Sequence, residues 1–340
     1  MIWLWAGFLV LILALLALDL GVVHRKAHVV SIREAAAWST FWISLALTFN
    51  FGIYHFMGAE AGLEFLTGYL IEKALSVDNI FVFVLLFSYF RVPAKYQHRV
   101  LFWGIIGALA LRGVMIGAGT VLIERFHWIT WFFGALLLFT GVRMAISRGI
   151  TIHPDDNPAV KLVRRVLAVT PDYHGQKFFV RQSGMRFGVA ATPLFVVLVL
   201  VETTDIVFAV DSIPAVFAVT RDPFLVFTSN VFAILGLRAL YFLLAGVMDR
   251  FRFLKLGLSI VLVFVGTKML IADFYKVPIG WSLAVIATVL TASVALSLLL
   301  PARIDPDEFA HLETGGEHSD DDDAPLTARS STAEHPPGPA

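Results

Sequence analysis

Apolar residues along this chain gather into nine blocks of about twenty residues, separated by short polar stretches. The blocks cover residues 2–20, 35–54, 64–90, 98–123, 127–146, 189–218, 224–248, 253–272 and 278–300. A helix of about twenty residues crosses roughly 30 Å of hydrocarbon. The first block lacks a basic leader and a small-residue cleavage site, so we interpret it as a spanning helix. The pattern predicts an all-α, polytopic transmembrane helical bundle with about nine spans.

The predicted transmembrane domain of residues 1–300 includes one long cytoplasmic loop, and an acidic cytoplasmic tail follows it. Residues 147–188 form a loop, with turn residues at 153–158 and a short amphipathic helix predicted near 160–169. Residues 301–340 are rich in Pro, Ser and Gly and carry the acidic run Asp320–Asp323, which is typical of a disordered tail. Both stretches are candidate contact sites for partner proteins.

The loops alternate in basic charge. Lys and Arg are concentrated after the first, third, fifth and seventh blocks, whereas each alternate loop holds at most one of them. Basic loops stay in the cytoplasm. We therefore expect the N-terminus outside the membrane and the C-terminus in the cytoplasm.

Composition narrows the function classes. Hydrophobic residues make up 58% of the chain and charged residues 15%, and the formal net charge is zero. We expect the lipid bilayer and no nucleic acid as a partner. The chain has no cysteine, which excludes disulfides, thiolate metal sites and cysteine nucleophiles.

Charged residues occur deep inside the apolar blocks, where an unpaired charge costs about 2.5–3.5 kcal/mol. They are five acids, Glu72, Asp78, Glu202, Asp205 and Asp211, and two bases, Arg112 and Arg238. We expect them to face the bundle interior, with the arginines in charge-balancing roles. Asp19 lies near the end of the first block, where a site role and a helix-capping role are equally good interpretations.

Helix geometry limits which acids share an ion. Residues six apart, such as Glu72 and Asp78, are separated by about 240° and 9 Å on a straight helix. Residues seven apart share a face, as do Glu72 with Asn79 and Asp205 with Ser212. Either the two helices break near 76–78 and 209–211, with Pro214 favouring a break in the second, or one ion takes ligands from both helices.

The same acids mark an internal repeat. Ser76–Ile80 matches Ala209–Ile213, and Glu72 and Asp205 each precede the central Asp by six residues. Later matches pair Leu109–Arg112 with Leu235–Arg238 and Gly141–Met144 with Gly266–Met269. We predict repeat A at about 64–146 and repeat B at about 189–272. Each holds three spans, an odd number, so the copies must be inverted, as in many secondary transporters.

Carboxylate, amide and hydroxyl oxygens form a hard site suited to Mg²⁺, Ca²⁺ or Mn²⁺. The candidate metal ligands are Glu72, Asp78, Asn79, Glu202, Asp205, Asp211, Ser212 and Asp19. We expect a divalent-cation transporter whose ion is cargo, with no tightly bound cofactor. No G-x-x-x-x-G-K-[ST] pattern is present, so an ion or proton gradient must supply the energy.

Two other functions are weighed against transport. In the first, the chain is a membrane scaffold whose acids are structural partners of Arg112 and Arg238. In the second, it is an intramembrane aspartyl hydrolase, but the required G-x-G-D pattern is missing. We therefore expect no enzyme activity.

Several motifs resemble those of the TerC family of integral membrane proteins, over about residues 1–300. They are Leu18-Asp19-Leu20-Gly21-Val22, Asn50-Phe51-Gly52-Ile53, Glu72–Asn79, Glu202-Thr203-Thr204-Asp205 and Ala209–Pro214. The branch of alkali-inducible Alx proteins looks most similar. The resemblance implies a bacterial inner-membrane protein of a family named for tellurium resistance, with members that export Mn²⁺. It also implies an ion pathway at Glu72, Asp78, Asn79, Glu202, Asp205 and Asp211, and less directly at Asp19.

Overall fold

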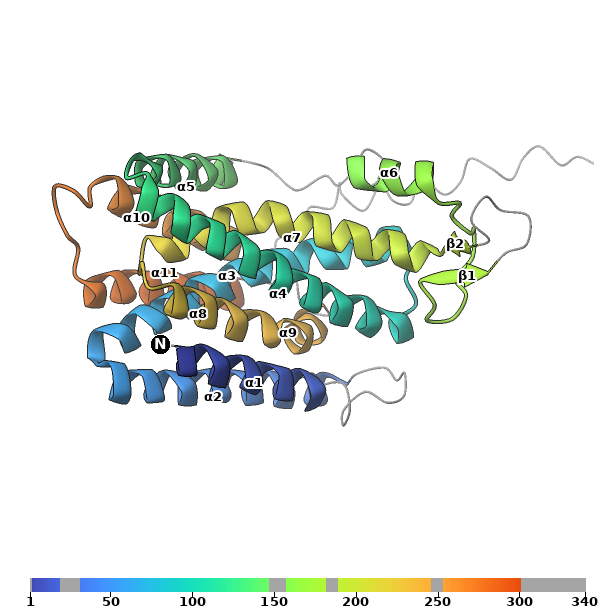
Figure 1. Cartoon of the computed structure of the whole chain (residues 1–340), viewed down its shortest axis with the longest axis horizontal. Coiled ribbons are helices and arrows are strands. Elements are labelled where there is room, and N and C mark those ends of the chain that lie inside the picture. Colours follow the sequence, from blue (N-terminus) through green and yellow to red (C-terminus); the bar gives the residue numbers. More distant parts are fainter. Residues whose placement is uncertain (1, 19–30, 147–156, 182–188, 246–252, 301–340) are drawn as a thin grey trace, which may run out of the picture. The chain divides into compact units, whose positions relative to one another are not determined.

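The computed structural model of the chain describes residues 2–18, 31–146, 157–181, 189–245 and 253–300. Asp19 and the tail 301–340 lie outside the described residues. The described helices, shown in Figure 1, are α1 (Ile2–Leu18), α2 (Ile32–Met57), α3 (Ala59–Tyr89), α4 (Ala94–Arg125), α5 (Trp128–Ile146), α6 (Pro158–Val166), α7 (Pro193–Phe217), α8 (Pro223–Leu235), α9 (Leu237–Leu244), α10 (Leu254–Leu270) and α11 (Ile279–Leu299). The two described strands are β1 (Phe179–Arg181) and β2 (Val189–Ala191).

Each of the nine predicted apolar blocks contains a helix. Among the described residues, α2, α4, α5, α7 and α11 are long and apolar enough to cross a membrane, and the bent pair α8–α9 makes a sixth candidate. The chain is therefore a helical membrane protein. The full number of nine crossings stays a prediction.

Polar residues at the helix starts explain several boundaries. Ser31 accepts a hydrogen bond from the Glu34 amide at the start of α2, at 3.3 Å. Asp222 accepts one from the Phe224 amide at the start of α8, at 2.8 Å. Such caps satisfy backbone donors that have no partner inside the helix. Proline occupies the first position of both α7 and α8, where its missing N–H does no harm.

The helices α3 and α7 are continuous through the segments 76–78 and 209–211. The idea that they break there is wrong. Pro214 lies inside α7 but only three residues before its end at Phe217, so it removes one hydrogen bond without dividing the helix. The break occurs elsewhere, at Gly236, where α8 and α9 meet with a bend of 40°.

Helices from the two predicted repeats pack against each other in pairs. Helix α4 packs on α7, α3 on α8, and α5 on α10; Figure 1 shows α4 and α7 side by side. The α5–α10 contact is closest at glycines. A Cβ on Gly266 would lie 2.8 Å from the Leu138 nitrogen and 2.9 Å from the Gly134 oxygen. Only glycine lets these two backbones approach so closely.

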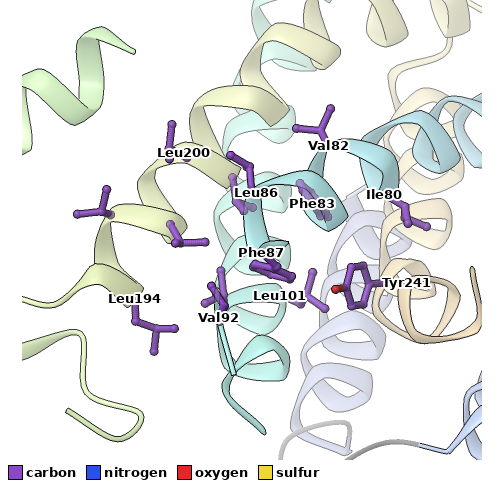
Figure 2. Packing of buried hydrophobic residues seen from close by; sticks show 14 of the residues in the cluster. Ile80, Val82, Phe83, Leu86, Phe87, Val92, Leu101, Leu194, Leu200 and Tyr241 are labelled. Carbon is purple, nitrogen blue, oxygen red and sulfur yellow. The ribbon is translucent and has the colours of Figure 1, made fainter. Parts of the chain in front are cut away.

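A cluster of buried apolar side chains fixes one end of α3, α4 and α7. Phe87 of α3, Leu101 of α4 and Leu200 of α7 belong to it, together with Tyr241 of α9 (Figure 2). The Phe87 and Tyr241 rings meet edge to face at 5.5 Å. The Tyr241 hydroxyl donates a hydrogen bond to Gln97 of α4 at 3.0 Å. This packing sets the relative positions of the helices that carry the buried charges.

The predicted loop 147–188 contains more structure than expected. The amphipathic helix expected near 160–169 is present as α6, capped by Asn157, whose side chain accepts from the Ala159 amide at 2.9 Å. The strands β1 and β2 form an antiparallel pair that sequence reasoning missed, with Phe179 opposite Ala191. Strand β2 occupies the first residues of the predicted sixth block, so the helix there begins only at Pro193.

Candidate ion-binding site inside the bundle

Arg112 of α4 joins three helices through its side chain. Its Nη1 donates to Glu72 Oε2 of α3 at 2.6 Å, and Nη2 and Nε donate to the two carboxylate oxygens of Asp205 of α7 at 3.0 and 3.2 Å. Nη1 also lies 3.3 Å from the hydroxyl of Ser212. A two-pronged contact between arginine and carboxylate is geometrically specific. The predicted residues Glu72, Asp205, Ser212 and Arg112 therefore meet at one point.

This cluster is almost completely shielded from its surroundings. Glu72 is 0% exposed, Arg112 2% and Asp205 4%. With both carboxylates ionised, Glu72, Asp205 and Arg112 by themselves carry a net charge of −1. Buried charges are expensive unless paired and hydrogen-bonded. The surplus negative charge makes the cluster a place where a cation or a proton is favoured.

One face of α3 carries a row of buried oxygens that lack a partner. Within the described part of the chain, Glu72 Oε1, Ser76 Oγ and Asn79 Oδ1 form no hydrogen bond. These residues are spaced four and three apart, so they share a helix face. Buried acceptors of this kind are normally satisfied. Of the three, sequence reasoning overlooked Ser76, although its spacing from Glu72 and Asn79 was a usable signal.

Glu202 lies on α7, one turn before Asp205. Its carboxylate packs against Gly107 of α4, where any larger residue would collide with it. Its Oε2 atom is buried and has no hydrogen-bond partner among the described residues. Gly107 is a second feature that the sequence did not reveal, because its role depends on which helix faces it.

The two remaining predicted acids lie apart from the Arg112 cluster. Asp211 accepts a hydrogen bond from Thr140 of α5 at 3.0 Å and interacts electrostatically with Arg143. Asp78 is half-buried and interacts electrostatically with Lys255. Thr140 was missed as a site residue, although a polar residue inside the block 127–146 was a signal. The described helices gather no group of three His, Asp or Glu side chains close enough to hold one ion.

Arg238, the predicted counterpart of Arg112, is 7% exposed and lies in the first turn of α9. It lines a small cavity together with Asp205 and Gly104. The second arginine therefore lines the same small cavity as the carboxylate that Arg112 holds. Asp19 cannot be placed relative to these residues because it lies outside the described part of the chain.

The arrangement is that of intramembrane carboxylates balanced by arginine in a polytopic helical protein. Residues 57–304 match the model of the "Integral membrane protein TerC family". The chain belongs to the TerC family. That match covers α3 through α11, so every helix with a buried acid or arginine lies inside the family region.

TerC relatives are similar along nearly their whole length. A membrane protein of Myxococcus xanthus is 57% identical over 296 residues, which is 87% of this chain and 92% of the relative. A protein of Escherichia coli strain K12, named as a proposed membrane-bound redox modulator, Alx, is 50% identical over 311 residues, 89% of this chain and 96% of the relative. A membrane protein of Rickettsia bellii is 43% identical over 301 residues, which is 88% of this chain and 99% of the relative. No solved structure matches the chain.

Proposed function

We propose that this protein is a secondary transporter that exports Mn²⁺ and similar hard divalent cations across the bacterial inner membrane. The observation that carries the proposal is the row of partnerless oxygens on α3, at Glu72, Ser76 and Asn79, beside a cluster with surplus negative charge. Oxygen ligands of this type suit Mn²⁺, Mg²⁺ and Ca²⁺. A divalent cation that displaced Arg112 would balance the charges of Glu72 and Asp205 and would satisfy neighbouring oxygens of this row.

In the resting state of the proposed mechanism, Arg112 occupies the carboxylates that would bind the metal. With no metal bound, its guanidinium neutralises part of the charge of Glu72 and Asp205. A divalent cation competes with that guanidinium for the same carboxylates, so metal binding and release of Arg112 are coupled. The described helices gather no three acids around one point, and in this proposal α3 and α7 shift to bring the ligands together. Such a shift is the event that alternating access needs.

The α5–α10 contact supports an inverted repeat. A Cβ on Gly134 would lie 3.2 Å from the Gly266 oxygen, and one on Gly141 would lie 3.0 Å from the Ser259 oxygen. Gly134 of repeat A corresponds to Ser259 of repeat B, and Gly141 corresponds to Gly266, because 259 − 134 = 125 and 266 − 141 = 125. Exchange of the two repeats therefore turns the first contact into the second. Pairs that map onto each other when the repeats are swapped are typical of a two-fold axis between them.

Orientation and energy source belong to the same proposal. The basic loops favour a cytoplasmic C-terminus and an external N-terminus. Export is then driven by a counter-ion or proton gradient and needs no cofactor. Partner proteins, where they exist, would contact residues 147–188 or 301–340. Calcium and other hard cations are the closest competitors of Mn²⁺ at such oxygens.

The test is the intracellular Mn content after a manganese load, in cells that lack their own exporters. Asp78→Asn and Asp211→Asn should fail to lower Mn at membrane levels equal to wild type. The matched control Asp172→Asn removes an exposed loop carboxylate and should export normally. A truncation at Pro301 should also export. Normal export by both Asp→Asn variants would show that the carboxylates of Asp78 and Asp211 are structural.

One observation favours the alternative of a membrane scaffold in a metal or tellurium stress response. Arg112 holds two of the acids in ion pairs, as a purely structural network would. In that case removal of the tail or of charges in the 147–188 loop would abolish function, whereas the buried acids would affect only folding. A redox role like that in the name of the Alx relative could not use a thiol of this chain, because the sequence has no cysteine.

A further inference from the structure

Lys73 places a positive charge at a break between two helices. It follows Glu72 on α3, but while Glu72 contacts Arg112, the Lys73 ammonium donates to the backbone oxygen of Ala233 in α8 at 3.3 Å. That oxygen belongs to the last turn of α8, which ends at Leu235. The two neighbouring side chains therefore serve different partners, and the lysine faces away from the buried carboxylates.

The end of α8 is a natural place for a cation. Carbonyl oxygens in the last turn of a helix lack the amide partners that a continuing helix supplies, and the helix dipole adds partial negative charge there. The 40° bend between α8 and α9 interrupts the hydrogen-bond ladder inside the bundle. In membrane proteins, the C-terminal ends of such half-helices coordinate small cations.

Gly236 makes room for the ammonium at this break. A Cβ at that position would lie 2.8 Å from Lys73 Nζ and 3.2 Å from the Trp42 Cβ. The backbone conformation at Gly236 is ordinary, with φ −82° and ψ −1°, so the glycine leaves space for the ammonium and serves no unusual torsion. The Lys73 ammonium therefore packs directly against the end of α8 and against Gly236.

We propose that the α8–α9 break is a monovalent-cation site that the protein fills with its own Lys73 ammonium. Its ligand class is a small primary ammonium ion, held by backbone carbonyl oxygen. The tethered charge positions Arg238, which lies two residues beyond Gly236 and lines a small cavity together with Asp205. Lys73 is therefore a positioning residue that ties α3 to the segment carrying the second arginine. This goes beyond metal export, since it concerns how the break is held.

A cavity beside the lysine provides a way to test the site. It measures about 250 Å³ and is lined by Lys73, Ala74, Leu240, Leu254 and Leu290. Lys73→Ala removes four side-chain atoms, three carbons and the ammonium nitrogen, and n-propylammonium has the same four heavy atoms. Propan-1-ol has nearly the same shape without the charge. The cavity is large enough to admit either molecule to the vacated position.

The experiment measures thermal unfolding of purified full-length protein. Lys73→Ala should unfold at a lower temperature than wild type, and n-propylammonium should raise that temperature through binding to the folded state. Propan-1-ol should not, and wild type should respond to neither. Equal responses to both molecules, or no response to n-propylammonium, would overturn the proposal. No transport is needed for this readout, so its failure is distinguishable from failure of the export hypothesis.

A second pair of variants applies if Lys73→Ala does not fold. Lys73→Arg keeps a positive charge, whereas Lys73→Met keeps length and apolar volume without charge. We expect Lys73→Arg to unfold close to the wild-type temperature, and Lys73→Met to unfold more readily, with a folding equilibrium weakened by roughly twofold to thirtyfold through loss of a cation at a helix end. The yield of folded protein should follow the same order. Equal behaviour of the two variants would show that charge at this position does not matter.

Discussion

Replacement of Arg112 by glutamine tests the buried charge network most directly. The change removes contacts of 2.6 Å to Glu72 and of 3.0 and 3.2 Å to Asp205. The two carboxylates, which are 0% and 4% exposed, then lie buried together without the positive charge between them. Removing one partner of a buried ion pair typically destabilises a protein by about 3–5 kcal/mol. We expect a loss of free energy of unfolding in that range.

The assay is unfolding of the purified protein in mixed micelles of mild detergent and increasing dodecyl sulfate. Arg125→Gln is the matched control, because Arg125 is exposed at the end of the same helix and a surface charge contributes about 0–1 kcal/mol. If Arg112→Gln unfolded at the same point as Arg125→Gln, the central role of the ion pairs would be refuted.

A double-mutant cycle measures the interaction between Arg112 and Glu72 separately from the other effects of each substitution. In the Arg112→Gln protein, Glu72→Gln removes one of the two carboxylates that have lost their partner. It should therefore lower the free energy of unfolding much less than Glu72→Gln does in the wild-type protein. Contacting charged residues show coupling energies of about 0.5–3 kcal/mol. A coupling energy near zero would mean that Glu72 and Arg112 do not depend on each other, whatever their distance of 2.6 Å.

Two further predictions follow from close contacts. Gly266→Ala should reduce the folded yield sharply, because its Cβ would lie 2.8 Å from the Leu138 backbone nitrogen, whereas Gly280→Ala, with nothing within 4 Å, should be neutral or stabilise α11 by up to about 1 kcal/mol. Thr140→Val should weaken Mn export by removing the 3.0 Å hydrogen bond to Asp211, and Thr140→Ser should restore it; equal export by both variants would show that the hydroxyl is not needed.

The helices themselves were readable from the sequence. Apolar blocks of about twenty residues are local signals, and each predicted block contains a helix. The burial of Glu72, Asp205, Arg112 and Arg238 was predictable too, because charges within such blocks must avoid lipid. Family membership, suggested by short motifs, is confirmed by the match over residues 57–304.

The contacts between helices were decided only by the tertiary structure. Sequence spacing shows that Glu72 and Asn79 share a face of α3, but not that Arg112 of α4 reaches Glu72 and Asp205 together. Sequence spacing favoured a break near Pro214, whereas the observed break is at Gly236, where a Cβ would lie 2.8 Å from Lys73 Nζ.

The physical reason is the range of the interactions. Helix formation depends on neighbours within about four residues along the chain, so sequence alone determines where helices lie. Partner choice depends on how side chains from different helices interlock, as Gly107 with Glu202 and Gly266 with Leu138 do here. Those contacts join residues far apart in the chain, and only the packed bundle determines them.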